Sequence, residues 1–535
     1  MRRYPALILA LLGLAGTVRP SPLPDLKVRA EYRHDAVDYE EETRDFYRLK
    51  TSLLLSRCSS LNITAVHLRH TGEYNHTWNL VLGDAAPWLS LLLGHFQVNY
   101  GAGLLVGKFT AFNPDPFAYR NPTAPNKTYI PVNSGNPAYA FHGAALTCVR
   151  DTGTLLLSLS GYYSVNRRFL NEDGYFDGVA SSSIGTVESS LRGSYSRSEP
   201  VTIHNTGMMA AVGVGETLSA HIYGTGTWLR TQTGSPIAWD GNGETPESGT
   251  DRACGAGATV RYADRYLSVF GEGVITMQWR SAGHPEGRFR HGGGYLYGFR
   301  LTHPSGGISL VRKVTVPGYY APFNNTVGER TPEKGVFLEG NYRLFAGINA
   351  GASLAAEKKQ SPSSMDQELP FMLREQIYLE YRRGRVESAR LTGKLYRKDA
   401  KGERSESRQL KQSLSLRITE RVWRVDAGTV YGWDSSDRSA LGATTGVVCK
   451  PGASAQFMVQ YCRALIRNGG SLYSVLAPMD NAGIPGMFIR DESHIIAAKA
   501  GFRWRTLGLS ARYLHQFARG ETIRGTVELA ASGVF

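Results

Sequence analysis

The chain has 535 residues, of which 42% are hydrophobic and only 20% are charged, and it contains 60 glycines and 28 tyrosines. Glycine at about 11% exceeds the usual roughly 7%, and aromatic residues reach 10%, which excludes a disordered polymer and disfavours a coiled coil or helical bundle. Lysine and arginine outnumber aspartate and glutamate by 60 to 46, giving a net charge of +14 that favours an anionic partner.

The first residues have the pattern of a secretory signal peptide. Arg2 and Arg3 form a short positive start, residues 6–15 are an apolar run, and Gly13-Leu14-Ala15 supplies the small residues of a cleavage site. The run is shorter than the roughly 20 residues that a spanning helix needs, which favours a signal peptide over residues 1–16 rather than a membrane anchor. No later stretch of 18 apolar residues occurs, so we expect a secreted protein, a periplasmic protein or a transmembrane β-barrel.

Apolar and polar residues then alternate along much of the chain. In the first example Leu26, Val28, Ala30 and Tyr32 interleave with charged residues, which is the period of a strand with one apolar and one polar face. The alternation continues for about ten residues at a time in further segments, which include residues 155–162, 218–228, 410–418, 423–433 and 496–505.

The connections between these segments are of two kinds. Tight turns are predicted at residues 382–385, 450–453 and 506–508, each with a glycine. Other gaps are long: Phe109 to Ala138 holds six prolines, and residues 166–188 and 231–250 are polar and rich in glycine and serine. Short turns at one end and long loops at the other are typical of an outer-membrane β-barrel.

A glycine-rich motif lies before the proline-rich segment. Gly94-His95-Phe96-Gln97-Val98-Asn99-Tyr100-Gly101-Ala102-Gly103-Leu104-Leu105 resembles the GDYxxxFGxGL signature of large bacterial outer-membrane β-barrel proteins. His142-Gly143-Ala144-Ala145 is similar to the Arg-Gly-x-Ala that follows in that family, with His142 in place of Arg. Residues 317–323 and 333–336 are similar to its Tyr-rich segment and its Asn-Glu-x-Gly motif, with Lys334 where an acidic residue is usual.

The resemblance covers residues 86 to the end and implies the fold and the compartment of that family. Some members carry a helix-hairpin-helix DNA-binding module at the N-terminus. This chain lacks that module, so we expect no nucleic-acid partner.

The last strand has a further signature. Val527, Leu529, Ala531, Gly533 and Phe535 share one face, and the sequence stops at the aromatic residue. This resembles the C-terminal signal that the barrel assembly machinery of bacteria recognises. The resemblance implies two partners, the lipid bilayer and that machinery during insertion, and a location in the outer membrane of a diderm bacterium after cleavage of the signal peptide.

Together these features predict an all-β protein with one large antiparallel transmembrane β-barrel over residues 17–535. About 520 mature residues at roughly 21 per strand give about 24 strands, within a range of 20 to 26. The alternative is a soluble protein with several β-domains, in which the apolar faces meet in packed cores.

No motif indicates an enzyme. His-Glu-x-x-His, Gly-x-Ser-x-Gly and paired-cysteine zinc spacings are absent, and the five cysteines form no Cys-x-x-Cys pair. The segment from Gly103 to Phe109 mimics a phosphate-binding loop but has Ala102 and Phe109 where glycine and Ser or Thr are needed. We expect no catalytic residue, no cofactor and no metal.

The polar faces of the later strands are strongly basic. If the apolar faces meet lipid, twelve basic residues point into the barrel against Glu380, Asp426 and Glu528. The candidate lumen residues are Arg374, Arg382, Arg390, Lys394, Lys411, Arg417, Arg424, Lys499, Arg503 and Arg512, joined by Arg505 and Arg524. The alternative for these residues is a set of structural ladders with carboxylates.

A barrel of this size is too wide for side chains alone to fill, so it either conducts or is plugged. We therefore expect a channel or transporter for small, anionic solutes, with the Pro-rich segment 109–138 constricting or covering the pore. The alternative is a non-transporting surface protein, an adhesin or a component of an export assembly, whose long loops bind a macromolecule.

Overall fold

The computed structural model describes residues 26–37, 42–55, 58–68, 73–101, 104, 106–107, 128–132, 140–169, 175–176, 200–215, 217–231, 238–239, 250–280, 289–316, 319, 323–324, 333–359, 371–400, 403–419, 422–452, 454–468, 472–474, 487–489, 492–518 and 521–534. The predicted signal peptide (residues 1–16), Phe535 and most of the segment 109–138 lie outside these residues. Within them no helix is long and apolar enough to cross a membrane.

Twenty-four long strands form the wall of one barrel. They are β1 (Leu26–Val37), β2 (Glu42–Leu54), β3 (Ser59–Leu68), β4 (Glu73–Ala86), β5 (Leu89–Val98), β8 (Phe141–Asp151), β9 (Leu155–Phe169), β11 (Pro200–Val214), β12 (Leu218–Thr231), β14 (Thr250–Ala263), β15 (Leu267–Arg280), β16 (Phe289–His303), β17 (Gly306–Thr315), β19 (Glu333–Phe345), β20 (Ile348–Lys359), β21 (Phe371–Arg383), β22 (Val386–Ala400), β23 (Glu403–Thr419), β24 (Trp423–Asp434), β25 (Ser439–Gly452), β26 (Ala455–Arg467), β29 (Ser493–Trp504), β30 (Leu507–Ala518) and β31 (Glu521–Val534).

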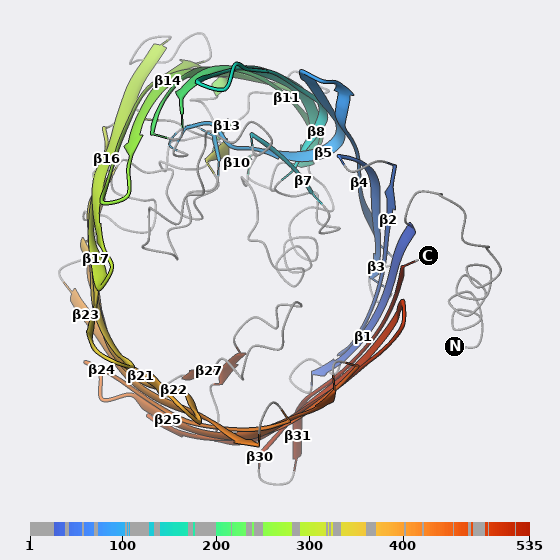
Figure 1. Cartoon of the computed structure of the whole chain (residues 1–535), viewed down its shortest axis with the longest axis vertical. Helices are drawn as coiled ribbons and strands as arrows, with labels where there is room; N and C mark the ends of the chain where they lie inside the picture. The colour runs from blue at the N-terminus through green and yellow to red at the C-terminus, as the bar shows by residue number, and fades with distance from the viewer. Residues whose placement is uncertain are drawn as a thin grey trace.

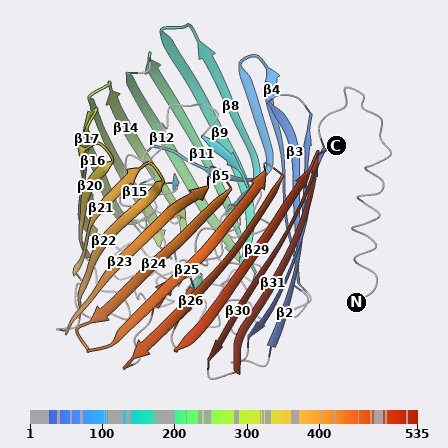
Figure 2. The same ribbon diagram turned by 60° about the horizontal axis from the view of Figure 1, so that its bottom comes forward.

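Each wall strand pairs with its neighbours in an antiparallel register, and β1 pairs with β31, from Lys27 opposite Val534 to Val37 opposite Arg524. This last pairing closes the ring, which Figure 1 shows end-on. Figure 2 shows the strands slanting along the wall. The sheet has 25 strands because the short β7 (Tyr129–Pro131) also pairs with β5, so 25 − 1 = 24 form the wall. The predicted all-β barrel and its strand count are confirmed, and the wall strands of the described residues form one closed sheet instead of several packed β-domains.

The two ends of the barrel differ as expected. One end carries the start of β1 and the end of β31. There the strands join through turns of two to four residues, including Gly384-Arg385 and Arg505-Thr506. The long connections all lie at the other end. The predicted gaps are too wide at three places, because the strands continue past the membrane-sized segment: Asn166 to Phe169 belong to β9, Thr231 ends β12 and Thr250 begins β14. We call the two ends the turn end and the loop end.

The outer face of the wall is apolar. Ile222, Ile275 and Ile377 are about two-thirds exposed, at 66%, 70% and 66%, and belong to a set of exposed large hydrophobic side chains on alternate positions around the ring. Water would not tolerate so large an apolar band, whereas lipid tails require one.

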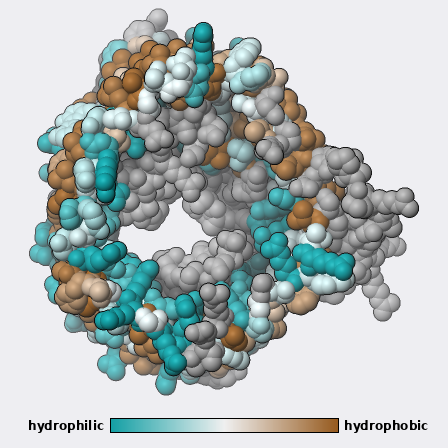
Figure 3. Space-filling model, in the orientation of Figure 1, coloured by the Kyte–Doolittle hydropathy of each residue, from teal (hydrophilic) through white to brown (hydrophobic). Residues whose placement is uncertain are grey.

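Seven short strands come from the long connections: β6 (Val106–Gly107), β7, β10 (Tyr175–Phe176), β13 (Ala238–Trp239), β18 (Phe323–Asn324), β27 (Leu472–Ser474) and β28 (Met487–Ile489). Figure 1 shows β7, β10, β13 and β27 inside the ring. Figure 3 shows the wall around a hollow, with hydrophilic residues gathered on its lower part in that view. The interior is therefore partly occupied.

Candidate functional site: the inner wall of the barrel

The inner wall has two sides with different surroundings. On β5 to β19, which we call the filled side, inward residues are buried against chain segments that enter the barrel. On β21 to β31, which we call the basic side, inward residues include all ten basic residues of the predicted set.

Three of these residues gather on β22 and β23 and form what we call the basic cluster: Arg390, Lys394 and Lys411. Lys411 lies directly opposite Thr392, which separates Arg390 from Lys394 on the same face. Diagonal neighbours in an antiparallel pair have Cβ atoms roughly 7 to 8 Å apart, so the three side chains are within reach of one another. Within the described residues none of the three forms an ion pair with a carboxylate, and the buried Nε of Arg390 has no hydrogen-bond partner.

Aromatic rings support the arginines of this region. The guanidinium of Arg390 lies 4.2 Å from the ring centre of Tyr378, and that of Arg374 lies 5.8 Å from the ring centre of Tyr396. Tyr378 itself packs over Gly351, where an added Cβ would lie 2.4 Å from the nearest ring atom. Such cation–π contacts hold the charge without neutralising it, so the positive charge of the wall persists.

Other predicted residues form ladders near the turn end. Arg382 pairs with Glu380 at 2.8 Å, Arg417 with Glu387 at 2.7 Å, and Arg424 with Asp426 at 3.1 Å. Glu387 was not among the predicted inward acids. It lies at a register shift between Val386 and Ser388, and such a bulge changes the alternation on which the prediction depended.

The remaining predicted residues meet in a second region. Lys499, Arg503 and Arg512 line an inward hollow of about 550 Å³ at the turn end, together with Arg29 of β1 and Glu528 of β31. Arg512 and Glu528 are paired at 2.7 Å. Arg29 was missed because only strands after residue 370 were considered, although the alternation of β1 places it on the polar face.

Arg505 and Arg524 were also predicted to point into the lumen, but the structure does not place either of them there. Arg505 is in a tight turn at a φ of 51°, and its guanidinium lies 5.5 Å from the ring of Trp504, an outward residue, so it does not line the lumen. The side chain of Arg524 and the whole of Phe535 lie outside the described residues. Val527, Leu529, Ala531 and Gly533 share the outward face of β31, opposite to the inward Glu528.

The basic side is not polar throughout. Inward residues Ala440, Cys462, Ala464, Ile495 and Leu514 form a buried apolar cluster near its loop end. The hairpin β27–β28 enters the ring beside β24 and β25. Alternation of apolar and polar residues does not reveal this cluster, because apolar residues occur there on both faces.

The glycine-rich motif enters the barrel on the filled side. β5 ends at Val98, Tyr100 and Leu104 are fully buried, and Gly101 has a φ of 59°, a conformation that favours glycine. An added Cβ at Gly101 would lie 2.7 Å from Thr259 Oγ1 and 2.8 Å from the Tyr223 hydroxyl. The motif therefore brings the backbone against the inner wall.

Hydrogen bonds fix these entering segments to the wall. The Leu104 amide donates to Glu272 Oε2 at 3.4 Å, Tyr223 donates to the other oxygen of Glu272, and Tyr319 donates to the carbonyl of Leu104. Asn79 Nδ2 donates to the carbonyl of Val132 at 3.0 Å. Sequence reasoning missed Glu272, and its only signal was a lone acid in an otherwise apolar and glycine-rich strand.

A cluster of tyrosines completes this packing. The hydroxyls of Tyr100 and Tyr129 are 2.9 Å apart, and both rings contact Tyr162 of β9. Burial raises the pKa of Tyr100 far above its usual value and that of Tyr129 to about 12. The cluster is stable only while its phenols remain neutral.

No group of three or more His, Cys, Asp or Glu side chains in the described ranges is arranged to hold a metal ion. The expectation of no metal and no cofactor stays a prediction.

No protein-family profile matches the chain, and no curated protein matches it. Solved structures do. The siderophore receptor PirA of Pseudomonas aeruginosa matches with a TM-score of 0.50 at 8% identity, over 97% of this chain and 82% of that one. A variant of the ferric enterobactin receptor PfeA of the same organism matches with a TM-score of 0.48 at 8% identity, over 97% and 81%. The translocation pore of the P pilus usher PapC matches with a TM-score of 0.42 at 10% identity, over 96% and 99%. At these identities the similarity to PirA is one of fold alone.

Proposed function

We propose that the protein is an outer-membrane β-barrel that carries small anionic solutes along its basic side. The apolar outer face, the short turns at one end and the long connections at the other support the membrane location. The proposed signal peptide at residues 1–16 and the C-terminal strand ending in Phe535 support export and recognition by the barrel assembly machinery.

The observation that carries the transport proposal is the basic cluster on the inner wall. Arg390, Lys394 and Lys411 lie together without ion pairs to carboxylates in the described part of the barrel. A low-dielectric wall focuses the field of fixed charges and raises the local density of counter-ions. Anions would therefore be concentrated along β22 and β23.

The filled side restricts the part of the lumen through which a solute could pass. The segments anchored by Asn79 of β4 and Glu272 of β15 lie against the filled side, so a solute would pass along the opposite wall. PirA, which shares the fold, is named as a siderophore receptor, and a solute entering from the loop end is the corresponding proposal here. We propose no enzymatic activity.

The rival proposal is a non-transporting surface protein, an adhesin or part of an export assembly. The long connections at the loop end would then bind a macromolecule, and the basic side would be structural. The ladders of Arg382, Arg417 and Arg424 are the feature that favours it.

Recording in planar bilayers separates the two proposals. Replacing Arg390, Lys394 and Lys411 by Gln should shift the reversal potential of the open pore towards cations, because the charge that attracts anions is removed. The measurement should be made at low salt. At 0.1 M the screening length is roughly 10 Å, so the field of the wall charges does not extend across a wide pore.

The matched control replaces two inward arginines together with their carboxylate partners by Gln, Arg417 with Glu387 and Arg424 with Asp426. Each pair loses one positive and one negative charge, so the anion preference should stay nearly unchanged. A wild-type pore that prefers cations, or equal shifts for both variants, would contradict the assignment. The absence of conductance, with and without deletion of residues 109–127, would favour the surface protein.

A further inference from the structure

A charged cluster lies on the outer face of the barrel, at the loop end of β22 and β23. Its members are Arg397 and Asp399 on β22 and Arg404, Glu406 and Arg408 on β23, and we call it the outer arginine cluster. They share a face with the exposed Leu391 and Leu410, so they point away from the lumen and continue the lipid-facing surface towards the loops.

Three arginines in this cluster share two carboxylates. Arg397 pairs with Asp399 at 2.5 Å, while Arg404 and Arg408 both pair with Glu406, at 2.8 and 2.6 Å. The side chains of Arg404 and Arg408 are still 58% and 55% exposed. A guanidinium has five N–H donors, and a carboxylate between two of them cannot use all ten. The cluster therefore presents donors and a net positive charge outwards.

The neighbouring strand places the cluster at a defined depth. Trp433 of β24 lies directly opposite Arg408, and its ring stacks on that of Tyr431 with the centroids 5.0 Å apart. Outward tyrosine and tryptophan mark the headgroup level of a membrane. Along the same row of hydrogen-bonded strands, Trp433 is opposite Ser439 and Ser439 is opposite the exposed Arg467. Arginines thus flank the aromatic pair at the level of lipid phosphates.

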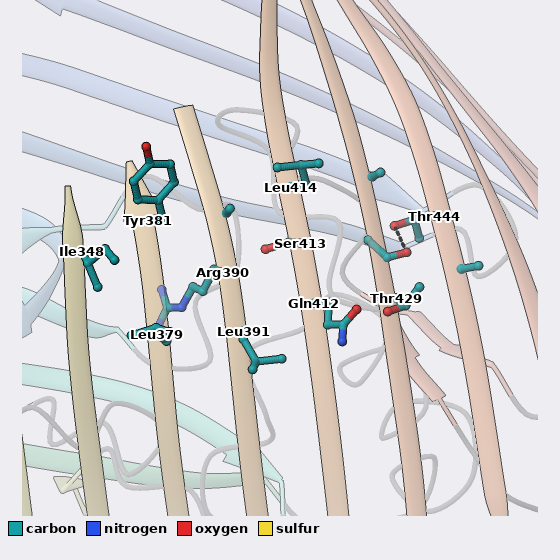
Figure 4. A pocket seen from close by; sticks show the side chains of 14 residues that line it. Ile348, Leu379, Tyr381, Arg390, Leu391, Gln412, Ser413, Leu414, Thr429 and Thr444 are labelled. Carbon is teal, nitrogen blue, oxygen red and sulfur yellow. Dashed lines mark hydrogen bonds between the residues drawn. The ribbon is translucent and has the colours of Figure 1, made fainter. Parts of the chain in front are cut away.

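An apolar hollow lies below the cluster on the same strands. It has a volume of about 640 Å³ and is lined mainly by outward side chains of β20 to β25, among them Leu379, Leu391 and Leu414 (Figure 4). The inward residues Arg390, Ser413 and Thr444 also border it. Small residues at Ala389, Ala427 and Ala443 leave the space open. Gln412, on its border, is four residues from Arg408 on one face of β23, which is roughly 13 Å along a strand.

We propose that the outer arginine cluster and this hollow form a site for a phosphorylated lipid of the leaflet at the loop end. Arg404 and Arg408 hold a phosphate by charge-assisted hydrogen bonds, which planar guanidinium groups make in pairs. One acyl chain of the same lipid occupies the hollow. The proposal depends on the membrane location proposed above and is independent of transport.

Native mass spectrometry of the detergent-solubilised barrel tests the site. The probes are diphosphorylated lipid A and its dephosphorylated form, which differ only in the phosphates. The wild-type barrel should bind the phosphorylated form on the order of tenfold more tightly. Arg404→Gln with Arg408→Gln should remove this preference. Glu406→Gln should strengthen binding of the phosphorylated form, because it frees donors on both arginines, and a purely structural cluster predicts the opposite.

The matched control is Arg383→Gln with Arg385→Gln, two exposed arginines at the turn end of β21 and β22. It should bind both lipids as the wild type does. Equal binding of the two lipid forms by the wild type, or an equal loss in the control, overturns the proposal. Binding of inorganic phosphate with the affinity of the lipid, or a dimer that blocks lipid binding, would identify another occupant and also overturn it. Conductance of the Arg404 and Arg408 double variant should be unchanged, so the outcome is separate from that of the transport proposal.

Discussion

The filled side and the basic side of the barrel share one outer surface but have opposite inner surfaces. On both, apolar residues such as Ile275 and Ile377 alternate outwards. On the filled side the inward positions hold Tyr162, Tyr223 and Leu296, which are buried, whereas on the basic side they hold the basic cluster and its neighbours. The outer face needs apolar residues at every strand because it contacts lipid. The residues on the inner face depend on whether chain segments or water lie against that part of the wall.

Charged side chains on the two sides differ in their burial and pairing. Glu272 and Lys313 on the filled side are 3% and 1% exposed, and both are held by partners. Lys394 on the basic side is exposed. A buried charge must be paired because desolvation is costly, while a solvated charge can remain available to a solute. The comparison therefore separates charges that fix the structure from charges that can act on a ligand.

The largest expected difference between the two sides concerns stability. Tyr100→Ala removes a fully buried ring from the filled side and should lower the free energy of unfolding by about 3 to 5 kcal/mol. Tyr378→Ala, the matched change on the basic side, should cost only about 1 to 2 kcal/mol, because that ring is partly exposed and mainly supports Arg390. Urea unfolding of barrels refolded into bilayers measures both, and equal losses would contradict the division into two sides.

The second-largest effect is expected at Glu272, which anchors an entering segment to the wall. Glu272→Ala leaves the Leu104 amide and the Tyr223 hydroxyl without this acceptor and should cost about 3 kcal/mol. It should also increase the conductance of the reconstituted pore, because the entering segment is released. Glu380→Ala is the control: its partner Arg382 is 63% exposed and can turn to water, so the cost should stay below about 1 kcal/mol. A pore unchanged by loss of Glu272 would show that the entering segments do not limit the pathway.

Alkaline pH should loosen the filled side by a smaller amount. The pKa of Tyr129 is raised to about 12 by burial, against about 10 in an unfolded chain. A raised pKa means that the stabilisation is complete below pH 10 and is lost as the pH rises from 10 to 12, by roughly 2 kcal/mol in total. Phenolate absorbance and unfolding measured over this range check the prediction. Replacing Tyr100 and Tyr129 together by Phe should remove most of the dependence, because burial raises the pKa of both phenols. A dependence that persists in full in this double variant would assign it to other groups.

The sequence by itself determined the wall. Alternation with a period of two marks each strand, because lipid outside and a different medium inside impose opposite demands on successive residues. Short connections of two to four residues join the strands at the turn end. The number of strands followed from length, since each crossing of a bilayer uses a nearly constant number of residues. These features are local, and local patterns can be recognised from the sequence alone.

Tertiary structure decided what each inward residue does. Arg390 and Arg417 lie on polar faces of neighbouring strands and look alike in the sequence, yet one belongs to the basic cluster and the other pairs with Glu387 through a bulge. Glu272 and Leu104 are 168 residues apart and meet because the chain re-enters the barrel. Alternation specifies only the face on which a residue lies. Its partner depends on strand register and on segments that return from distant loops, and neither has a local signal in the sequence.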